Sequence, residues 1–462
     1  MSTSRSKDEK REGHLRSGEA GTGRKDTERK GAGHQGAIRQ GSSHHRRLSW
    51  TSPITLALLL GLLAFVMRAI YLIESGENPF RFHLDLDPRN YHEWALTILR
   101  GEAFGAGPFL QAPLYPYFLA LCYLVLGPGL IAPLWIQAVL AAGTVTLAAL
   151  IAHRYWGRRG LLATGLAMAL YKPAIFYTGV LLVPVLATAL AATALYFAPR
   201  RRLLAGLTTG LAGLAHPTIL PGTALIAFVM AGTAPAHASE PHLPPTRGGF
   251  SFRWPGRRAV AALVVGIALG IAPATVYNLV RTGHWVPISA NTGINLYIGN
   301  GPEANGFYRS PFGMRGEVDP CGIAEAGRLA GEPLDAVEAN RFWVDAAIEA
   351  AGQEPARVAG LVAMKLWAAL GAFEVPQIES FDFEKRFSVL LRLPFLPGWI
   401  ALLLLSAAGL AARPRDRLLW ALLGGVILTA LVMAAFFVTG RFRLPAHLFL
   451  ALASGGAVAI AL

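Results

Sequence analysis

Cysteine is almost absent from this sequence, with two among 462 residues. Cys122 lies in an apolar segment and Cys321 in a polar one, which argues against a disulfide framework or a cysteine metal cluster. The sequence also contains no P-loop and no glycine-rich strand-to-helix fingerprint. The first 50 residues have no apolar core of the kind found in a cleavable signal peptide. We therefore expect neither a site for a water-soluble nucleotide nor a leader removed before Trp50.

Charged residues are also scarce. They make up 15% of the chain, whereas hydrophobic residues make up 53%, and the mean hydropathy is +0.42. Several apolar runs reach about 20 residues, the length needed to cross a bilayer. A soluble globular domain does not have this composition. The sequence therefore predicts an all-α polytopic membrane protein with roughly 10–12 transmembrane helices and polar loops on the outer face.

The N-terminal residues 1–50 are polar and basic, with 12 Lys and Arg against 6 Asp and Glu, a net charge of +6. Such a segment has too little apolar surface to fold and is expected to be a disordered tail. Nucleic-acid binding is one interpretation, but no aromatic residues are interleaved with the charges for stacking. The positive-inside rule instead predicts a cytoplasmic tail that touches anionic membrane lipids. No nucleic-acid partner is expected.

The remaining chain divides into three parts by its apolar runs. We expect a transmembrane module at residues 51–280 with a first outer loop at 74–112, an outer loop at 281–354, and a C-terminal membrane region at 355–462. Within the first part, Lys172-Pro173 and His216-Pro217 are expected to break apolar segments, because proline cannot continue a helix. Residues 355–373 form either an interfacial helix or a crossing, because Arg357 and Lys365 interrupt the apolar run.

The direction of the early crossings is left open. Basic clusters at residues 153–159 and 200–202 are both expected to be cytoplasmic. Two apolar segments, 113–126 and 130–152, separate the first outer loop from the first cluster, and two full crossings would place that cluster outside. A short helix that does not cross the membrane would remove the conflict.

Two carboxylates and two arginines are predicted to meet on the outer face. Asp85 and Asp87 follow the first apolar segment, and Arg441 and Arg443 lie in a turn between the last two. An arginine fork matches phosphate oxygens, and a carboxylate within reach of a hydroxyl acts as a general base. The combination indicates group transfer from a lipid phosphate. Asp87-Pro88 also fits a helix N-terminus, and the arginines also fit side chains that reach out to lipid head groups.

Histidines near the carboxylates raise the question of a metal. His83 and His92 lie beside Asp85 and Asp87, but no second cluster stands at ligand spacing, so no metal site is expected. A divalent cation remains possible without support from the sequence, and no other cofactor is expected. His216 is expected to pack inside the helix bundle.

Several motifs resemble a known family. They are DPRNYHEWA from Asp87, QAPLYPYFLA from Gln111, FYTGVLL from Phe176, GLAGLAHP from Gly210, ISANTGINLYIGN from Ile288, and RFRLP from Arg441. In order and spacing they resemble bacterial membrane glycosyltransferases of the GT-C fold, related to the protein O-mannosyltransferases and the lipid A aminoarabinose transferases. The resemblance covers residues 51–462.

This resemblance implies a sugar donor linked to a polyprenyl phosphate, transfer on the outer face of a bacterial inner membrane, and inversion at the sugar carbon. Asp87 would be the base, with Asp85 as second candidate, and Arg441 and Arg443 would hold the lipid phosphate. The acceptor would be a glycan, a lipid or a protein. The pocket for donor and acceptor would include Tyr91, His92, Tyr115, Asn291, Asn295 and Asn300.

Two departures from the family pattern limit this inference. His216-Pro217 stands where Arg-Pro is expected, which puts a phosphate contact there in doubt. Asp87 is followed by Pro88 rather than by the glutamate of the O-mannosyltransferases, which weakens the case for a protein acceptor. The alternative function is a transporter or flippase of lipid-linked saccharides. Such a protein is expected to have paired halves and ionisable groups at mid-membrane depth, whereas this chain collects its charges in outer loops.

Overall fold

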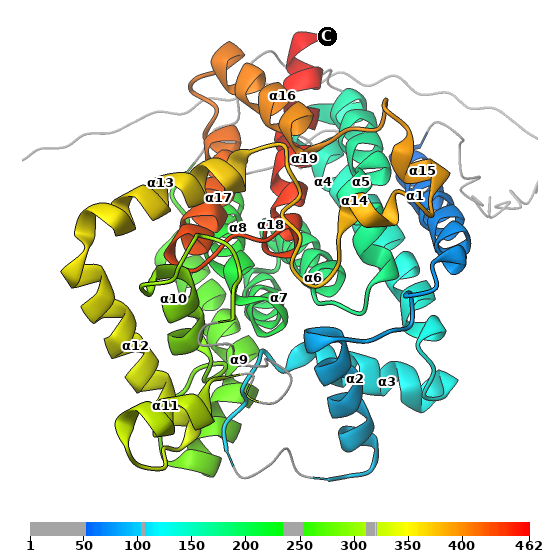
Figure 1. The fold of residues 1–462 in the computed structure, drawn as a ribbon. Coiled ribbons are helices and arrows are strands. Elements are labelled where there is room, and N and C mark those ends of the chain that lie inside the picture. The colour runs from blue at the N-terminus through cyan, green and yellow to red at the C-terminus, as the bar shows by residue number, and fades with distance from the viewer. Residues whose placement is uncertain (1–51, 103–106, 234–252, 311–318, 320) are drawn as a thin grey trace, which may run out of the picture. The chain divides into compact units, whose positions relative to one another are not determined.

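The computed structural model describes residues 52–102, 107–233, 253–310, 319 and 321–462, and every regular element in this part of the chain is a helix (Figure 1). Five helices are long and apolar enough to cross a membrane: α1 (Pro53–Glu74), α4 (Ile131–Leu170), α9 (Arg257–Thr282), α17 (Arg417–Ala435) and the run from α18 into α19 (Gly440–Ala461). The predicted all-helical, multi-pass membrane architecture is confirmed. The expected N-terminal tail and most of the polar linker before α9 lie outside the described residues.

Five further apolar helices are shorter. They are α3 (Leu114–Leu126), α6 (Pro184–Phe197), α7 (Arg202–Ala215), α8 (Leu220–Ala231) and α16 (Trp399–Ala412). At 1.5 Å per residue they rise about 18–21 Å, less than the roughly 30 Å hydrocarbon core. The expected breaks explain two of these lengths, since α4 stops at Leu170 before Pro173, and α7 stops at Ala215 before Pro217.

The conflict in the early crossings disappears with α3 and α4. The 13 residues of α3 are too few for a crossing. The 40 residues of α4 are two helical segments joined at Gly157, whose φ of +66° is a left-handed conformation that favours glycine. The chain therefore runs through the bundle up to Gly157 and returns after it.

The basic clusters lie at one end of the bundle. Arg154 donates to the carbonyl of Tyr196, which lies just before Arg200, over 2.9 Å. The neighbouring Tyr155 hydroxyl lies 3.0 Å from that of Thr233, after the end of α8. A side chain on Gly456 near the end of α19 would meet both Trp156 and Leu419, which follows the basic loop at residues 413–417. The basic clusters at residues 153–159, 200–202 and 413–417 therefore lie at the same end of the bundle.

Helices α7 and α9 pack unusually closely. Each carries two glycines four residues apart, Gly206 and Gly210 on α7, Gly266 and Gly270 on α9. A Cβ on Gly210 would lie 2.9 Å from the Cα of Gly270, and one on Gly266 would lie 2.8 Å from the Cα of Gly206. Small residues with this spacing let helix backbones approach within a membrane.

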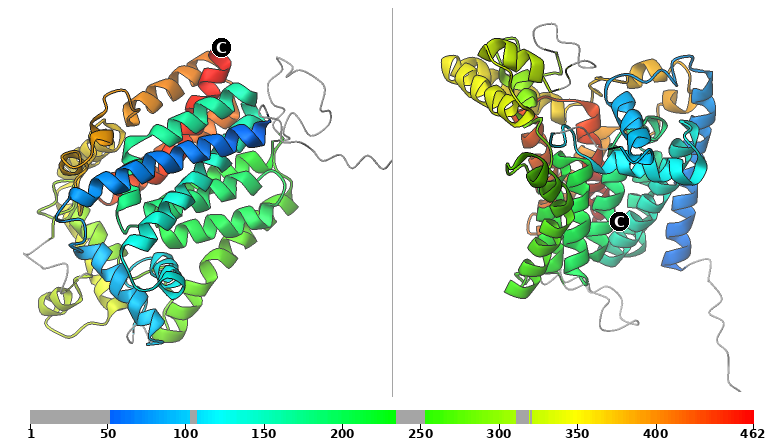
Figure 2. Two further views of the ribbon diagram at one scale, coloured as in Figure 1. Left: turned by 90° about the vertical axis from the view of Figure 1, so that its right-hand side faces the viewer. Right: turned by 90° about the horizontal axis from the view of Figure 1, so that it is seen from below.

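At the other end of the bundle, the polar loops form helices of their own. These are α2 (Leu86–Leu99), α10 (Thr292–Asn300), α11 (Ile323–Ala330), α12 (Ala336–Gln353), α13 (Pro355–Leu370), α14 (Phe381–Glu384) and α15 (Val389–Arg392). In the right-hand view of Figure 2, α1 runs vertically and the yellow α12 lies at the upper end. Buried Lys365 ties α13 to its neighbours by donating to Asn300 Oδ1 over 3.0 Å and to the carbonyl of Ala434 over 3.1 Å. The short α5 (Lys172–Phe176) and α18 (Gly440–Arg443) also reach this end.

Candidate active site

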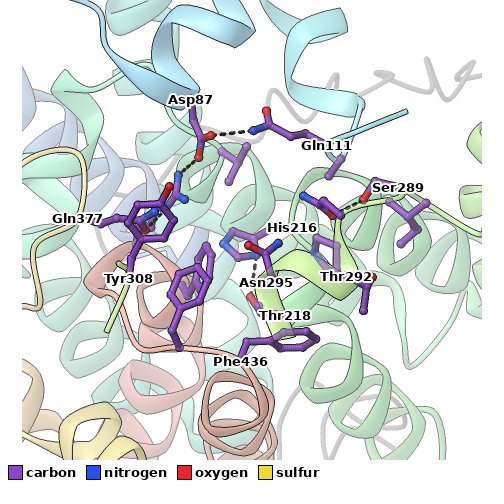
Figure 3. Close-up of a pocket in the computed structure, with 18 of the residues that line it drawn as sticks. Asp87, Gln111, His216, Thr218, Ser289, Thr292, Asn295, Tyr308, Gln377 and Phe436 are labelled. Atoms are coloured by element: carbon purple, nitrogen blue, oxygen red, sulfur yellow. Dashed lines mark hydrogen bonds and ion pairs between the residues drawn. The ribbon is translucent and has the colours of Figure 1, made fainter. Parts of the chain in front are cut away.

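A cavity of about 360 Å³ opens where the start of α2, the break between α7 and α8, the segment before α10 and the turn of α18 converge (Figure 3). Its volume falls within the range of small-molecule sites. Of the residues predicted for the site, the structure brings Asp87, Tyr91, Asn291, Asn295 and Arg441 to the cavity wall.

Asp87 enters the cavity from the first turn of α2. Its Oδ1 accepts from Gln111 Nε2 over 2.8 Å, and its Oδ2 forms an ion pair with Arg441. Its side chain is 17% exposed and caps no helix, since Asp85 occupies the N-cap position. Leu86 beside it has a φ of +48°, which is uncommon for a branched residue. Such strain at the start of α2 is typical of a functional segment.

Arg441 lines the cavity from α18. Its Nε donates to Gln377 Oε1 over 3.0 Å, and its guanidinium stands 5.0 Å from the centre of the Phe442 ring. A side chain at the preceding Gly440 would displace its neighbours, because a Cβ would lie 2.8 Å from Glu374 Oε2 and 3.1 Å from the Tyr177 hydroxyl. The backbone just before Arg441 therefore packs closely against Glu374 and Tyr177. Asp87 and Arg441 are 354 residues apart in the chain and meet across the cavity.

Arg443 does not line the cavity. It donates to the carbonyls of Gly371 and Phe373 over 2.6 and 2.9 Å, and pairs with Glu374 Oε1 at 2.6 Å. Burial raises the pKa of Glu374, while the guanidinium of Arg443 opposes that rise. The donors of Arg443 are thus occupied in holding the chain that follows α13, and Arg441 alone of the two predicted arginines faces the cavity.

Three predicted pocket residues do not line the cavity. The Tyr115 hydroxyl donates to Gln137 over 2.8 Å, and its ring packs edge-on against Tyr91 at 5.2 Å. His92 Nδ1 lies 2.8 Å from the Tyr123 hydroxyl, on a different side of α2. Asn300 is bonded to Lys365 and to the carbonyl of Ala435. Each of these side chains forms a hydrogen bond with a residue that does not line the cavity.

Tyr91 does face the cavity. Burial and the charge of Asp87 raise the pKa of Tyr91, so its phenol stays protonated and supplies a hydrogen-bond donor. Asp85, the second candidate base, is exposed and does not line the cavity. The charge of Asp85 instead affects Glu379. Burial, together with the negative charges of Glu384 and Asp85, raises the pKa of Glu379 to about 7.

The structure adds residues that the motifs alone did not select. Gln111 binds Asp87, Gln377 binds Arg441, and Tyr308 and Thr218 complete the wall. His216, expected to pack inside the bundle, is indeed 3% exposed, but it also lines the cavity. The sequence signal for His216 was its place before the proline that breaks the α7–α8 run, whereas Gln377 and Tyr308 stand in no recognisable pattern.

Two polar atoms at the cavity have no hydrogen-bond partner among the described residues. They are His216 Nε2 and Gln111 Oε1. The other nitrogen of His216 lies 2.7 Å from the Thr218 hydroxyl, and Figure 3 shows the ring beside Asn295. A buried polar atom without a partner is costly, so both atoms are positioned to bind a ligand. In the part of the chain that the structure describes, no three His, Cys, Asp or Glu side chains gather as metal ligands do.

The fold and the cavity define a multi-pass membrane protein with a polar site at the end of the bundle opposite its basic clusters. No protein family model matches the sequence, and no curated protein matches it either. Two solved structures are similar: ArnT from Cupriavidus metallidurans bound to undecaprenyl phosphate, and the same protein in the apo state. Each is 14% identical and covers 86% of this chain, with 77% and 76% of the ArnT chain covered and TM-scores of 0.38 and 0.34.

Proposed function

We propose that this protein is a membrane glycosyltransferase that moves a sugar from a polyprenyl-phosphate donor to an acceptor hydroxyl on the outer face of the membrane. The observation that carries the proposal is the pairing of Asp87 with Arg441 on the wall of a polar cavity. A carboxylate suits proton removal from a hydroxyl, and a guanidinium suits a phosphate. The sequence motifs favour the same chemistry through their resemblance to GT-C enzymes.

In this proposal Arg441 exchanges partners when the donor binds. Its fork leaves Asp87 and takes two oxygens of the donor phosphate, a geometry that planar guanidinium groups favour. Asp87 then keeps only the amide of Gln111, and the loss of the neighbouring positive charge favours proton uptake by its carboxylate. Donor binding itself thereby activates the base.

The transfer step then balances without any further reactant. The acceptor oxygen forms a bond to the anomeric carbon while the bond from that carbon to the phosphate oxygen breaks. The hydroxyl proton moves to Asp87, and the electron pair of the broken bond stays on the lipid phosphate. Arg441 stabilises the charge that develops there. Attack opposite to the leaving group inverts the anomeric carbon.

The orientation follows from the charge distribution. The basic clusters share one end of the bundle and the cavity lies at the other, and the positive-inside rule assigns the basic end to the cytoplasm. We therefore place the cavity on the outer face of a bacterial inner membrane. The proposed acceptor of the sugar is a glycan, a lipid or a protein.

The test incubates purified protein with a panel of polyprenyl-phosphate sugars and a host membrane fraction as acceptor source, and measures release of the bare lipid phosphate. Asp87→Asn keeps the shape of the side chain and is expected to slow release by at least about 100-fold. The matched control is Asp85→Asn, two residues away and outside the cavity lining, which should retain activity.

The reverse pattern, with Asp85→Asn inactive and Asp87→Asn active, would show that the base is wrongly assigned. Absence of lipid phosphate release with every sugar would reject the transferase proposal. A flippase would move the intact lipid-linked saccharide across the bilayer and leave its phosphate bond unbroken.

A further inference from the structure

We infer that the donor sugar is a neutral, polyhydroxylated monosaccharide rather than an amino sugar or a uronate. The inference rests on the proposed function and specifies the substrate class of the same cavity. It is drawn from the charges and hydrogen-bonding groups of the cavity wall.

Among the described residues that line the cavity, only two carry a full charge, Asp87 and Arg441, and they are paired with each other. The remaining polar lining is neutral. It consists of amides, hydroxyls, phenols and one imidazole. The imidazole of His216 is buried in the same cavity as Arg441, and both burial and a neighbouring cation disfavour its charged form.

An ammonium group on the sugar would find no free carboxylate among the described residues of the wall to offset its charge. Asp87 is the only carboxylate on the described wall, and both of its oxygens are engaged, by Gln111 and by Arg441. When the phosphate takes Arg441, the proposed chemistry requires Asp87 for the proton of the acceptor. A carboxylate on the sugar would also remain unpaired, because the phosphate would occupy Arg441, the only cationic side chain on the described wall. Burying an unpaired charge is costly.

A hydroxylated sugar, in contrast, fits the neutral wall. Each hydroxyl group is both a donor and an acceptor, and so is each amide side chain. The side chains of Asn90 and Asn295 line the cavity and make no hydrogen bond to another described residue. The unpartnered Nε2 of His216 and Oε1 of Gln111 add two further positions. Together these groups present unsatisfied hydrogen-bonding capacity without charge.

Aromatic rings supply the apolar counterpart. Tyr308 and Phe436 line the cavity, and Figure 3 shows Tyr308 beside Gln377 and Phe436 at the bottom of the view. A sugar ring has an apolar face of C–H groups, which aromatic faces cover well, while its hydroxyls point to the amides around the edge. The wall therefore matches a sugar in both its polar and its apolar parts.

The experiment compares donors on one lipid carrier, undecaprenyl phosphate. The neutral set carries glucose, mannose, galactose or arabinose, and the charged sets carry the corresponding 2-amino or 4-amino sugars and glucuronate. Release of lipid phosphate is measured for each with the wild-type protein and a host membrane fraction. We expect the preferred neutral sugar to exceed its matched amino sugar in kcat/KM by at least about tenfold, because the amino sugar brings an unpaired charge into the cavity.

A charge-introducing variant tests the cause. Asn295→Asp adds a carboxylate to the cavity wall and is expected to reduce the neutral preference by about tenfold, chiefly through a lower KM for the amino sugar. The matched control is Asn305→Asp, which adds the same charge on an exposed residue outside the cavity lining and should leave the preference unchanged.

The outcomes separate the two proposals. Release from neutral and amino sugars at equal rates, or a preference that Asn295→Asp leaves unchanged, would overturn the inference while the transferase function stands. Release from no sugar at all would overturn the transferase function itself.

Discussion

The ion pair across the cavity predicts a specific pattern of stability in variants. The side chains of Arg441 and Asp87 are 8% and 17% exposed. At an effective dielectric constant of about 20, unit charges about 4 Å apart attract by about 4 kcal/mol, and breaking a buried pair costs about 3–5 kcal/mol because one charge is left unpaired. The remaining exposure and the amides of Gln111 and Gln377 reduce this cost, so we expect Asp87→Asn and Arg441→Gln each to lose about 2–3 kcal/mol.

The double variant separates stability from chemistry. With both charges removed, Asn and Gln remain able to hydrogen-bond, and we expect most of the lost stability to return, with a coupling energy of about 2 kcal/mol. Transfer should be no higher than in Asp87→Asn, because under the proposed function the double variant lacks both the base and the phosphate ligand. Unfolding of the purified protein in mixed detergent micelles measures the first quantity, and release of lipid phosphate measures the second.

The reasoning fails if either single variant is as stable as the wild type, or if the losses of the two single variants simply add in the double variant. Either result would mean that Asp87 and Arg441 do not interact in the folded protein. Asp85→Asn serves as the control for charge removal on the same loop, and its stability should remain within about 0.5 kcal/mol of the wild type, as for an ordinary surface substitution.

Two further predictions concern stability alone. The pKa of Glu379 is about 7 in the folded protein and 4.5 ordinarily, so the folded state binds more protons than the unfolded state between these values and stability should fall as pH rises through this window. Glu379→Gln should remove that slope and stabilise the protein at pH 8 by at most about 3 kcal/mol, measured as unfolding at several pH values; an unchanged slope would contradict the pKa. Gly210→Ala should destabilise the protein by about 1–3 kcal/mol through overpacking, because its Cβ would lie 2.9 Å from the Cα of Gly270. The control Gly143→Ala, whose Cβ meets no atom within 4 Å, should be neutral. Equal stability of the two variants would refute the close contact between α7 and α9.

The sequence was sufficient to predict the helical architecture and the breaks within it. Apolar length indicates a membrane helix directly, and a proline inside such a run marks where it must stop. The meeting of Asp87 and Arg441 was also predictable, because charges at a membrane boundary are costly unless they serve a function or find each other. Neither inference needs knowledge of how the helices pack.

The sequence was not sufficient to predict which side chains face the cavity. Tyr91 and His92 are neighbours on α2, yet one lines the cavity and the other bonds to Tyr123, because successive residues of a helix point about 100° apart. Arg441 and Arg443 similarly share a turn and point to different partners. A sequence motif predicts that its residues lie near one another. The direction of each side chain, however, depends on contacts with segments that are distant in the sequence.

The short helices explain why Asp87 and Arg441 pair with each other. Helices α6, α7 and α8 rise only about 18–21 Å from the basic end, so the break that holds His216 lies within the thickness of a roughly 30 Å hydrocarbon core. Unpaired charges at this depth are costly, so the two charges on the cavity wall are least costly when each offsets the other. In the proposed reaction, the donor phosphate replaces the carboxylate as partner of Arg441, and the same exchange frees the carboxylate to accept a proton. The ion pair that stabilises the cavity wall is therefore the same pair that the proposed reaction breaks to activate its base.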